Sequence, residues 1–305
     1  YAGLATIMDI TDLTETKKQL NLLAQAVEQT DDLVKITDRN GNLTYVNDSL
    51  VAHSGYKKSE LIGKNPRIFK SGEHDAAFFE NLWETISNGN TFRDTFINRK
   101  KDRSIVYEEE TITPIQDRKG RITHYVATGK NVTEQILMEQ ELTKRATIDM
   151  LTDIYNRDEA NRHMDMVLDQ VQRYGEHFGI LMLDIDHFKQ VNDEYGHDVG
   201  DEVLKTFSKI VSLHIRKSDI FARWGGEEFI IITPHLEDGT LLKFAEKLRV
   251  VIGACEFPQV GTMSVSIGVT DFSADDTKKS LLKRADEALY ASKAKGRDCV
   301  TYHEA

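Results

Sequence analysis

Two copies of one segment divide the chain and limit how it can fold. GLATIMDITDLTETKKQL begins at Gly3, YVATGKNVTEQILMEQEL begins at Tyr125, and the two align without a gap. Each copy has a short apolar stretch, then a threonine able to cap a helix, then a long charged segment. The pattern predicts a strand that leads into a helix, once near the beginning of the chain and once near its middle. The alternative is chance similarity between two polar helices.

The helix predicted in the first copy carries an apolar seam with steps of three and four residues. The seam residues are Ile10, Leu13, Leu20, Ala24 and Val27. Lys17 interrupts the seam, which otherwise has the spacing that pairs parallel helices in a coiled coil. We therefore expect the helices at 10–27 and 133–148 to support a homodimer. We interpret residues 1–20 as the exit strand and signalling helix of a truncated upstream domain, in a fragment that begins at Tyr1.

The stretch between the two copies, residues 21–132, is predicted to form one unit. DDLVKITDRNGNLTYVNDSL contains two short strands around an Asn-Gly turn, which is a strong hairpin signal. Helices are predicted near 57–61 and 76–87. Three strands are predicted after them, near 91–98, 105–114 and 124–128.

This order of elements resembles a PAS sensory domain. The resemblance rests on ITDRNGNLTYVND, GYKKSELIGKNP and NRKKDRSIVYEEETITPIQDRKGRITHYVATGKNVTE. It implies a signal-receiving or dimerising role, in some members with a bound ligand. Light-sensing relatives carry a reactive cysteine after GxN, and Pro66 in that place excludes their photochemistry.

The ligand of this unit stays unknown at the level of sequence. We rank an unidentified ligand or an empty pocket first, flavin second, and haem bound through His53 or His74 third. Phe92 stands where flavin-binding relatives often have tryptophan. Neither the signal nor the sign of its effect follows from the residues.

Helices and strands alternate from Asp149 onward. FGILMLDIDHFKQVND contains a fully apolar run, Ile180–Leu183, that ends at Asp184. DIFARWGGEEFIIIT gives two strands joined at a Gly-Gly turn, VSIGVTDF gives another strand, and amphipathic helices lie between them. This alternation predicts an α/β layer with helices packed on a sheet.

Three carboxylates are predicted to meet at one edge of this sheet. Asp184 follows the apolar strand, and the neighbouring hairpin brings Glu227 and Glu228 to the same edge. Adjacent carboxylates repel unless cations neutralise them, and two Mg²⁺ or Mn²⁺ ions would do so and activate an oxygen nucleophile on a phosphate. Taken singly, each acid has an alternative explanation that is at least as good. Asp184 or Asp186 could cap the following helix, and Glu227 and Glu228 could form a solvated hairpin tip.

The composition narrows the class of partner. A formal net charge of −11 argues against nucleic acid as the main partner, but it leaves a nucleotide open. The two cysteines, Cys255 and Cys299, lack metal or redox spacing, which favours a reducing compartment. No apolar run approaches the ~20 residues of a membrane helix. We expect a cytoplasmic location, with an upstream membrane anchor of the parent protein left open.

The second half resembles a diguanylate cyclase domain of the GGDEF type, with GGEEF as its variant. The supporting motifs are DMLTDIYNR, LDIDHFKQVNDEYGHDVGDEVL, RKSDIFARWGGEEF, VSIGV and ADEALYASKAKGR. The resemblance implies a ferredoxin-like, adenylyl-cyclase-like fold and the conversion of two GTP into cyclic di-GMP and two pyrophosphates. The expected architecture is α+β: a PAS domain at 21–132, a helical linker at 133–148 and a GGDEF domain at 149–303.

The resemblance also implies roles for single residues at the reaction centre. The metal ligands would be Asp184, the carbonyl of Ile185, Glu227 and Glu228. The catalytic residues would be Glu228, Glu227 and Lys189. The division of work between the two glutamates stays open.

Further residues would bind GTP and the product. His187 and Phe188 would offer backbone N–H groups to phosphates. Asn192 and Asp201, with His197 beside them, would read the guanine. Lys293 and Arg297, four apart on one helix face, would hold the terminal phosphates. The inhibitory product site would comprise Arg216, Asp219 and Arg223.

Two functions follow from this reading. The first is a sensor-regulated, product-inhibited diguanylate cyclase that acts as a homodimer through the PAS domain and flanking helices. The alternative is a catalytically silent GGDEF nucleotide receptor or a PAS dimerisation module. The complete acid set favours the enzyme, since degenerate receptors tend to lose it.

Overall fold

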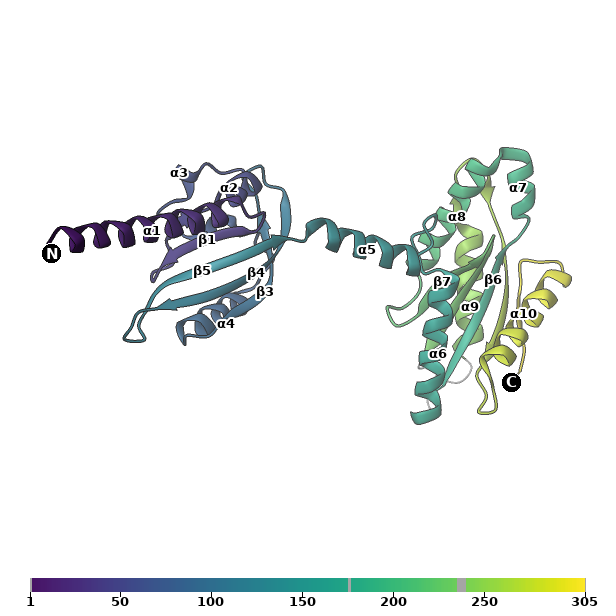
Figure 1. Cartoon of the computed structure of the whole chain (residues 1–305). Helices are drawn as coiled ribbons and strands as arrows, with labels where there is room; N and C mark the ends of the chain where they lie inside the picture. The colour runs from purple at the N-terminus through teal and green to yellow at the C-terminus, as the bar shows by residue number, and fades with distance from the viewer. Residues whose placement is uncertain (1, 175–176, 235–239, 305) are drawn as a thin grey trace. The chain divides into compact units, whose positions relative to one another are not determined.

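The computed structural model describes residues 2–174, 177–234 and 240–304, and among residues 2–12, at 172 and at 174 only the backbone (Figure 1). The chain forms two compact units, Tyr1–Gln140 and Glu141–Ala305. In the described part, no helix is both long and apolar enough to cross a membrane.

The first unit is built on an antiparallel sheet in the order β2-β1-β5-β4-β3. Its strands are β1 (Leu33–Asp38), β2 (Leu43–Val46), β3 (Phe92–Arg99), β4 (Ile105–Gln116) and β5 (Ile122–Asn131). The predicted Asn-Gly hairpin is confirmed, because β1 pairs with β2 and Oδ1 of Asp38 accepts the N–H groups of Asn40 and Asn42 in the turn.

Short helices cover one face of this sheet. They are α2 (Asp48–Ser54), α3 (Lys58–Leu61), the 3₁₀ helix Pro66–Phe69 and α4 (Ala76–Ser87). Asn47 caps α2 and also accepts from the N–H of Val34, so one side chain joins helix and sheet. One apolar cluster includes Leu33, Leu50 and Phe69, and a second cluster lies between α4 and β3.

The N-terminal segment differs from the prediction. Helix α1 runs from Ala2 to Gln29, so the strand expected in the first copy is a helix instead. A strand needs a neighbour for its backbone hydrogen bonds, whereas a helix satisfies them internally. No described strand pairs with this segment. Two seam residues, Leu13 and Leu20, have exposed side chains, at 70% and 61%.

The second copy forms the predicted strand and helix, β5 followed by α5 (Thr133–Thr147). Thr133 does not use its hydroxyl as a helix cap. Its Oγ1 accepts from the N–H of Tyr107 on β4 at 2.9 Å, and the N–H of Val132 donates to the carbonyl of Tyr107 at 2.9 Å. The beginning of α5 is therefore fastened to β4.

The second unit has a five-stranded sheet in the order β12-β11-β6-β8-β7, with β11 and β12 parallel and the other pairs antiparallel. The strands are β6 (Phe178–Ile185), β7 (Ile220–Gly225), β8 (Glu228–Pro234), β11 (Val265–Asp271) and β12 (Val300–Tyr302). A small hairpin, β9 (Glu256–Phe257) and β10 (Gly261–Thr262), stands apart.

Helices cover both faces of this sheet. They are α6 (Arg157–Tyr174), α7 (Phe188–Tyr195), α8 (His197–Ser212), α9 (Thr240–Ala254) and α10 (Lys278–Ala294). Alternate residues of β6 face opposite sides: Leu181 and Leu183 pack with α8 and α9, while Ile180 and Met182 pack with α6 and α10. This explains why β6 reads as a continuous apolar run, since all of its residues are buried.

Helix α10 lies unusually close to β11. A Cβ at Gly268 would stand 2.2 Å from the backbone nitrogen of Leu289 and 2.3 Å from the carbonyl oxygen of Ala285. Only glycine allows this approach, because any side chain would collide with the helix backbone. The helix that carries Lys293 is thus seated directly on the sheet.

Candidate active site

Asp184 and Glu228 lie opposite each other at one edge of the second sheet. The two residues are direct partners in the antiparallel register of β6 and β8. Partners of this kind project their side chains to the same face. Because Leu183 and Ile185 face α8 and α9, Asp184 faces α10.

Lys293 on α10 meets this carboxylate. Its Nζ lies 2.6 Å from Oδ2 of Asp184, whose residue is 6% exposed. Burial raises the pKa of Asp184 to about 6; Lys293 lowers it, and the charges of Glu227 and Glu228 add to the rise. The charges of Glu227 and Glu228 therefore act on Asp184, although the three acids do not form one closely gathered cluster among the described residues.

The two glutamates differ in backbone setting. Glu228 is the first residue of β8, whereas Glu227 lies in the turn before it. The carbonyl of Glu227 accepts from the N–H of Ile185 at 3.4 Å. Glu228 and Lys293 also border a hollow of about 390 Å³ against α10. The position of Glu228 opposite Asp184 makes it the better placed of the two to share a cation with that carboxylate.

The donor set suits a divalent cation that keeps other ligands. Among the described residues, no three Asp, Glu, His or Cys side chains gather closely enough to hold a metal ion by themselves. Mg²⁺ is commonly held by one or two carboxylates together with substrate phosphates and waters. Asp184 and Glu228 match that requirement, since both offer hard oxygen donors.

Helix α7 begins at the same edge of the sheet. His187 precedes it with a φ of 61°, and Phe188 is buried as an anchor. Lys189 is exposed on the first turn. The N–H groups of Phe188 and Lys189 have no acceptor within the described ranges, as is usual at a helix beginning. These donors are free for an anion.

Asn192 and Asp201 come from facing helices, α7 and α8. A Cβ at Gly200 would lie 2.0 Å from Oδ1 of Asn192, so the amide fills the space above this glycine. Asp201 is the next residue and is exposed, as is His197 at the start of α8. Asn192 thus lies against the turn of α8 that carries Asp201.

Arg297 differs from its predicted setting. Helix α10 ends at Ala294, so Arg297 lies beyond it with a φ of 68° and shares no helix face with Lys293. Gly296, with a φ of 110°, turns the chain away from the helical path. Arg297 is exposed, and its guanidinium makes no ion pair with any described residue.

Asp186 is a residue whose importance the sequence did not reveal. It is 2% exposed and accepts from the hydroxyls of Ser264 and Ser266, both at 2.7 Å, and from the N–H of Asp298 at 3.0 Å. It is therefore not a helix cap but an anchor for the turn that carries Arg297. Its partners lie 78 or more positions away in the chain, so no local spacing could have indicated them.

The predicted product site has two members in one turn. The backbone N–H of Arg216 donates to Oδ2 of Asp219 at 2.7 Å, and the Arg216 side chain is exposed. Oδ1 of Asp219 is buried without a partner among the described residues, and burial raises the pKa of this carboxyl. Arg223 is engaged elsewhere: it contacts Asp149 at 3.3 Å and donates to the carbonyl of Gly226 at 2.9 Å.

The histidines considered for haem are already engaged in the first unit. Nε2 of His53 lies 2.9 Å from Glu108. Nε2 of His74 accepts from the N–H of Ile97 at 2.9 Å, and its ring stacks on Phe78. Neither histidine lines the cavity of that unit, so neither is placed to bind an iron inside it.

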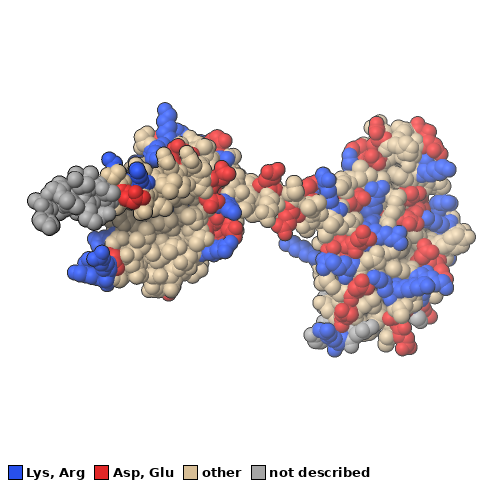
Figure 2. Space-filling model, viewed as in Figure 1, with Lys and Arg blue, Asp and Glu red and all other residues tan. Residues whose placement is uncertain are grey.

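Surface charge does not indicate a nucleic-acid interface. On the face of the second unit shown in Figure 2, acidic and basic side chains are interspersed, and the described residues form no continuous basic stripe there. This agrees with the net charge of −11.

Comparisons with known proteins identify both units. The family "Diguanylate cyclase, GGDEF domain" matches residues 146–299, and the PAS fold family matches residues 21–132. Response regulator PleD of Caulobacter vibrioides is 37% identical over 161 residues, which are 51% of this chain and 36% of PleD. Diguanylate cyclase DgcM of Escherichia coli O157:H7 is 32% identical over 205 residues, 67% of this chain and 50% of DgcM. The chain thus spans half or less of the length of these relatives.

A solved structure agrees with this result. The coiled coil and GGDEF domain of DgcB from Caulobacter crescentus, in complex with c-di-GMP, matches with a TM-score of 0.54 and 29% identity. The match covers 56% of this chain and 93% of that one. The chain is therefore a mixed α/β protein in which a PAS domain at 21–132 precedes the second domain. Because the match at 146–299 covers half of the chain, the protein belongs to the GGDEF diguanylate cyclase family.

Proposed function

We propose that this chain is a sensor-regulated diguanylate cyclase that condenses two GTP into cyclic di-GMP and releases two pyrophosphates. One observation carries the proposal: Asp184, Glu228 and Lys293 converge at one sheet edge from three separate elements. Family membership and relatives named as diguanylate cyclases support it.

The acids would hold the metal ions. Asp184, Glu228 and the carbonyl of Ile185 would bind Mg²⁺ or Mn²⁺, two ions per site with the nucleotide phosphates as further ligands. When bound, these ions supply charge neutralisation on the phosphates and activation of the 3′-hydroxyl. Glu227, in the turn beside them, would be a further metal ligand, and Glu228 would assist the second ion or take the proton of that hydroxyl.

The remaining residues would bind and orient GTP. The N–H groups at the beginning of α7, with Lys189, would hold phosphate oxygens. Asn192 would donate to and accept from the guanine edge, while Asp201 would accept from its ring and exocyclic N–H groups. Lys293 and Arg297 would contact the terminal phosphates, Arg297 from the turn anchored by Asp186.

Two such domains are needed for one product molecule. Two phosphodiester bonds would form for each product molecule. In each step, the 3′-oxygen of one GTP attacks the α-phosphorus of the facing GTP, and pyrophosphate leaves. Because one domain would hold one GTP, the enzyme would act as a homodimer. The exposed apolar residues of α1 and α5, such as Leu20, Leu137 and Leu142, support dimerisation through the helices that flank the PAS domain.

Regulation would use the PAS domain and the product. The hydrogen bonds between Tyr107 and Thr133 would pass a change in the PAS sheet to α5. Arg216 and Asp219 would bind cyclic di-GMP and keep two active sites apart. GTP as the substrate implies a cytoplasmic reaction.

The decisive experiment is product identification. The purified chain is incubated with GTP and Mg²⁺, and the product is separated and identified by mass spectrometry. Glu228→Gln should lower turnover at least about 100-fold, because a neutral amide is a poor metal ligand. Glu256→Gln, at an exposed strand residue outside the site, should retain full activity. If wild type binds GTP without forming cyclic di-GMP, the chain is a silent receptor.

A further inference from the structure

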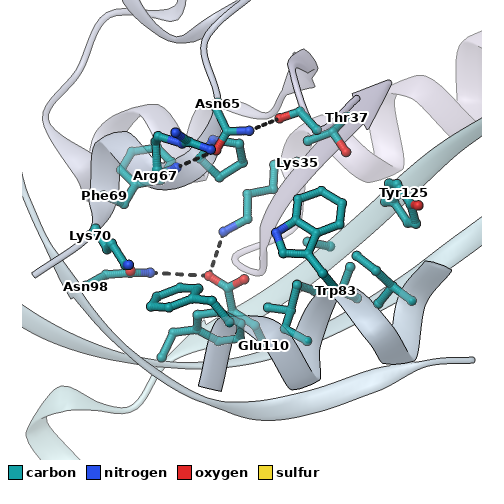
Figure 3. A pocket seen from close by; sticks show the side chains of 18 residues that line it. Lys35, Thr37, Asn65, Arg67, Phe69, Lys70, Trp83, Asn98, Glu110 and Tyr125 are labelled. Atoms are coloured by element: carbon teal, nitrogen blue, oxygen red, sulfur yellow. Dashed lines mark hydrogen bonds and ion pairs between the residues drawn. The ribbon is translucent and has the colours of Figure 1, made fainter. Parts of the chain in front are cut away.

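The first unit contains a cavity with largely apolar walls, a polar end at Lys35 and Glu110, and further polar lining residues that include Asn65, Arg67 and Lys70. Its volume is about 550 Å³, within the range of small-molecule sites. The apolar walls include Phe69, Phe79, Leu82, Trp83, Ile86 and Phe96. At one end, Lys35 of β1 and Asn98 of β3 both point toward Glu110 of β4 (Figure 3).

This polar end is a buried ion pair with unused hydrogen-bonding capacity. Nζ of Lys35 lies 2.6 Å from Oε1 of Glu110, and their side chains are 9% and 2% exposed. An ammonium has three donors, yet among the described residues Lys35 makes only this hydrogen bond. A buried donor without an acceptor is costly, so an occupant that offers an acceptor would be stabilised here.

The aromatic walls make water a poor occupant. A water molecule is held in a cavity by two to four polar partners, and rings such as Phe79 and Phe96 offer none. A flat ring system can instead stack against these side chains and bury its own faces. The cavity is thus suited to a planar molecule with polar groups at one edge.

The charges near the polar end exclude a strongly charged edge. Glu108 lies beside this pair, bonded to Asn98 at 2.8 Å and to His53 at 2.9 Å. An anionic head would therefore add a third negative charge to two buried carboxylates, while a cationic one would lie against Lys35. A neutral edge that offers an acceptor to Lys35 and a donor to Glu110 avoids both of these electrostatic costs.

We propose that this cavity binds a planar heteroaromatic molecule through a neutral lactam edge, a carbonyl oxygen next to an N–H. The carbonyl accepts from Lys35, and the N–H donates to Glu110. Isoalloxazines, pterins and guanine derivatives share this chemistry. The histidine engagements described above leave haem without a ligand in the cavity.

The test is a set of titrations of the full chain by calorimetry. The lactam probes are riboflavin, biopterin and guanosine. The probe that binds most tightly identifies which of the three classes of lactam the cavity prefers. At least one should bind saturably, at one molecule per chain. Phenazine, which is flat without a lactam, and decanoate, which is apolar and anionic, should bind at least about tenfold more weakly.

A matched pair of variants and a matched ligand test the recognition itself. Lys35→Met should weaken the preferred probe at least about tenfold, whereas Lys64→Met, at an exposed lysine outside the cavity, should leave it unchanged. The same probe methylated at its lactam nitrogen should bind the wild-type chain at least about tenfold more weakly. This result does not depend on whether a variant folds.

Three results would overturn the proposal. The first is no saturable binding of any lactam probe up to about 1 mM, which corresponds to a binding free energy weaker than about −4 kcal/mol. The second is binding of phenazine as tight as that of the lactams. The third is a methylated probe that binds as well as its parent. None of these outcomes affects the proposed cyclase reaction, which uses the second unit.

Discussion

Nζ of Lys293 lies 2.6 Å from Oδ2 of Asp184, so the last turn of α10 and the end of β6 meet through one charged contact. The contact joins the residue proposed for the terminal phosphates to a proposed metal ligand. Lys293 therefore belongs to the site even before a nucleotide is considered.

Replacing Lys293 should impair the reaction without unfolding the domain. Lys293→Ala removes a charge that can contact both a carboxylate and a phosphate, and we expect kcat/KM for GTP to fall about 10- to 100-fold. Lys295→Ala removes an exposed lysine that contacts Thr301 at 3.1 Å and should change little. Steady-state kinetics with a pyrophosphate-release assay compare the two, and equal effects would contradict the assignment.

A methyl group at Gly200 should disturb the proposed guanine site. Gly200→Ala places its Cβ where Oδ1 of Asn192 now lies, so the amide must move. We expect KM for GTP to rise about tenfold or more through lost base hydrogen bonds. Gly253→Ala, on α9 with open space around it, should be neutral or slightly stabilising. An unchanged KM in Gly200→Ala would remove Asn192 from the site.

Product inhibition should depend on Arg216. Its side chain is exposed, and the neighbouring Asp219 has a buried oxygen without a partner in the described chain. Arg216→Ala should keep the initial rate of wild type but continue after wild type has slowed, since a guanidinium contact is lost. Progress curves with added cyclic di-GMP measure this, with Lys217→Ala as the control. Equal slowing of all three proteins would show that inhibition uses another surface.

Dimerisation should depend on the seam of α1. Leu20→Glu adds a charge where a leucine is 61% exposed, and the dimer should weaken at least about tenfold. Gln19→Glu adds the same charge beside the seam and should have less effect. Light scattering over a concentration series compares them. A wild type that is monomeric at micromolar concentration and fully active would contradict the dimer.

The stability of the first unit should fall as pH rises from about 4.5 to about 7 and level off above neutrality. Burial raises the pKa of Glu110 to about 7 from its usual value of 4.5, with Glu108 adding to the rise and Lys35 opposing it. Between these values the folded chain keeps a proton that the unfolded chain has released, so the free energy of unfolding decreases with pH. The decrease from pH 5 to 8 should be about 1–3 kcal/mol.

The pH effect is measured by hydrogen exchange of β1 and β4, which reports this unit alone. Glu110→Gln should remove most of the dependence. Glu109→Gln, on the exposed side of the same strand, should retain it. Nε2 of His53 lies 2.9 Å from Glu108, and His53→Gln is a control for the loss of a neighbouring contact. A dependence unchanged in Glu110→Gln would show that Glu110 is not its source.

Much of the fold was predictable because it depends on local patterns. The apolar run that ends at Asp184 predicted a strand, and the Gly-Gly turn before Glu227 predicted that both glutamates lie at the edge where Asp184 meets Glu228. The hairpin at Asn40 follows equally from turn chemistry. Such features are decided by neighbouring residues in the chain, which the sequence shows directly.

Other features depend on partners distant in sequence or on where a helix stops. Lys293 and Arg297 have helical spacing, but Gly296 ends the path between them. The sequence around Asp186 fits a helix cap, yet the hydrogen-bond partners of Asp186 come from distant strands and turns. The segment after Gly3 has strand-like residues but no strand beside it, and a helix results. In each case a tertiary contact, or its absence, outweighs the local preference.

The contact between Gly268 and α10 has a consequence for how members of this family could diverge. Lys293 is held at its place by a helix that rests on bare backbone, so a mutation at Gly268 would displace the lysine while leaving every proposed catalytic residue intact. A relative with all signature acids but a larger residue here would look competent by its motifs and yet be impaired in the way expected of Lys293→Ala. Judging activity in such sequences therefore requires reading a position that touches neither nucleotide nor metal.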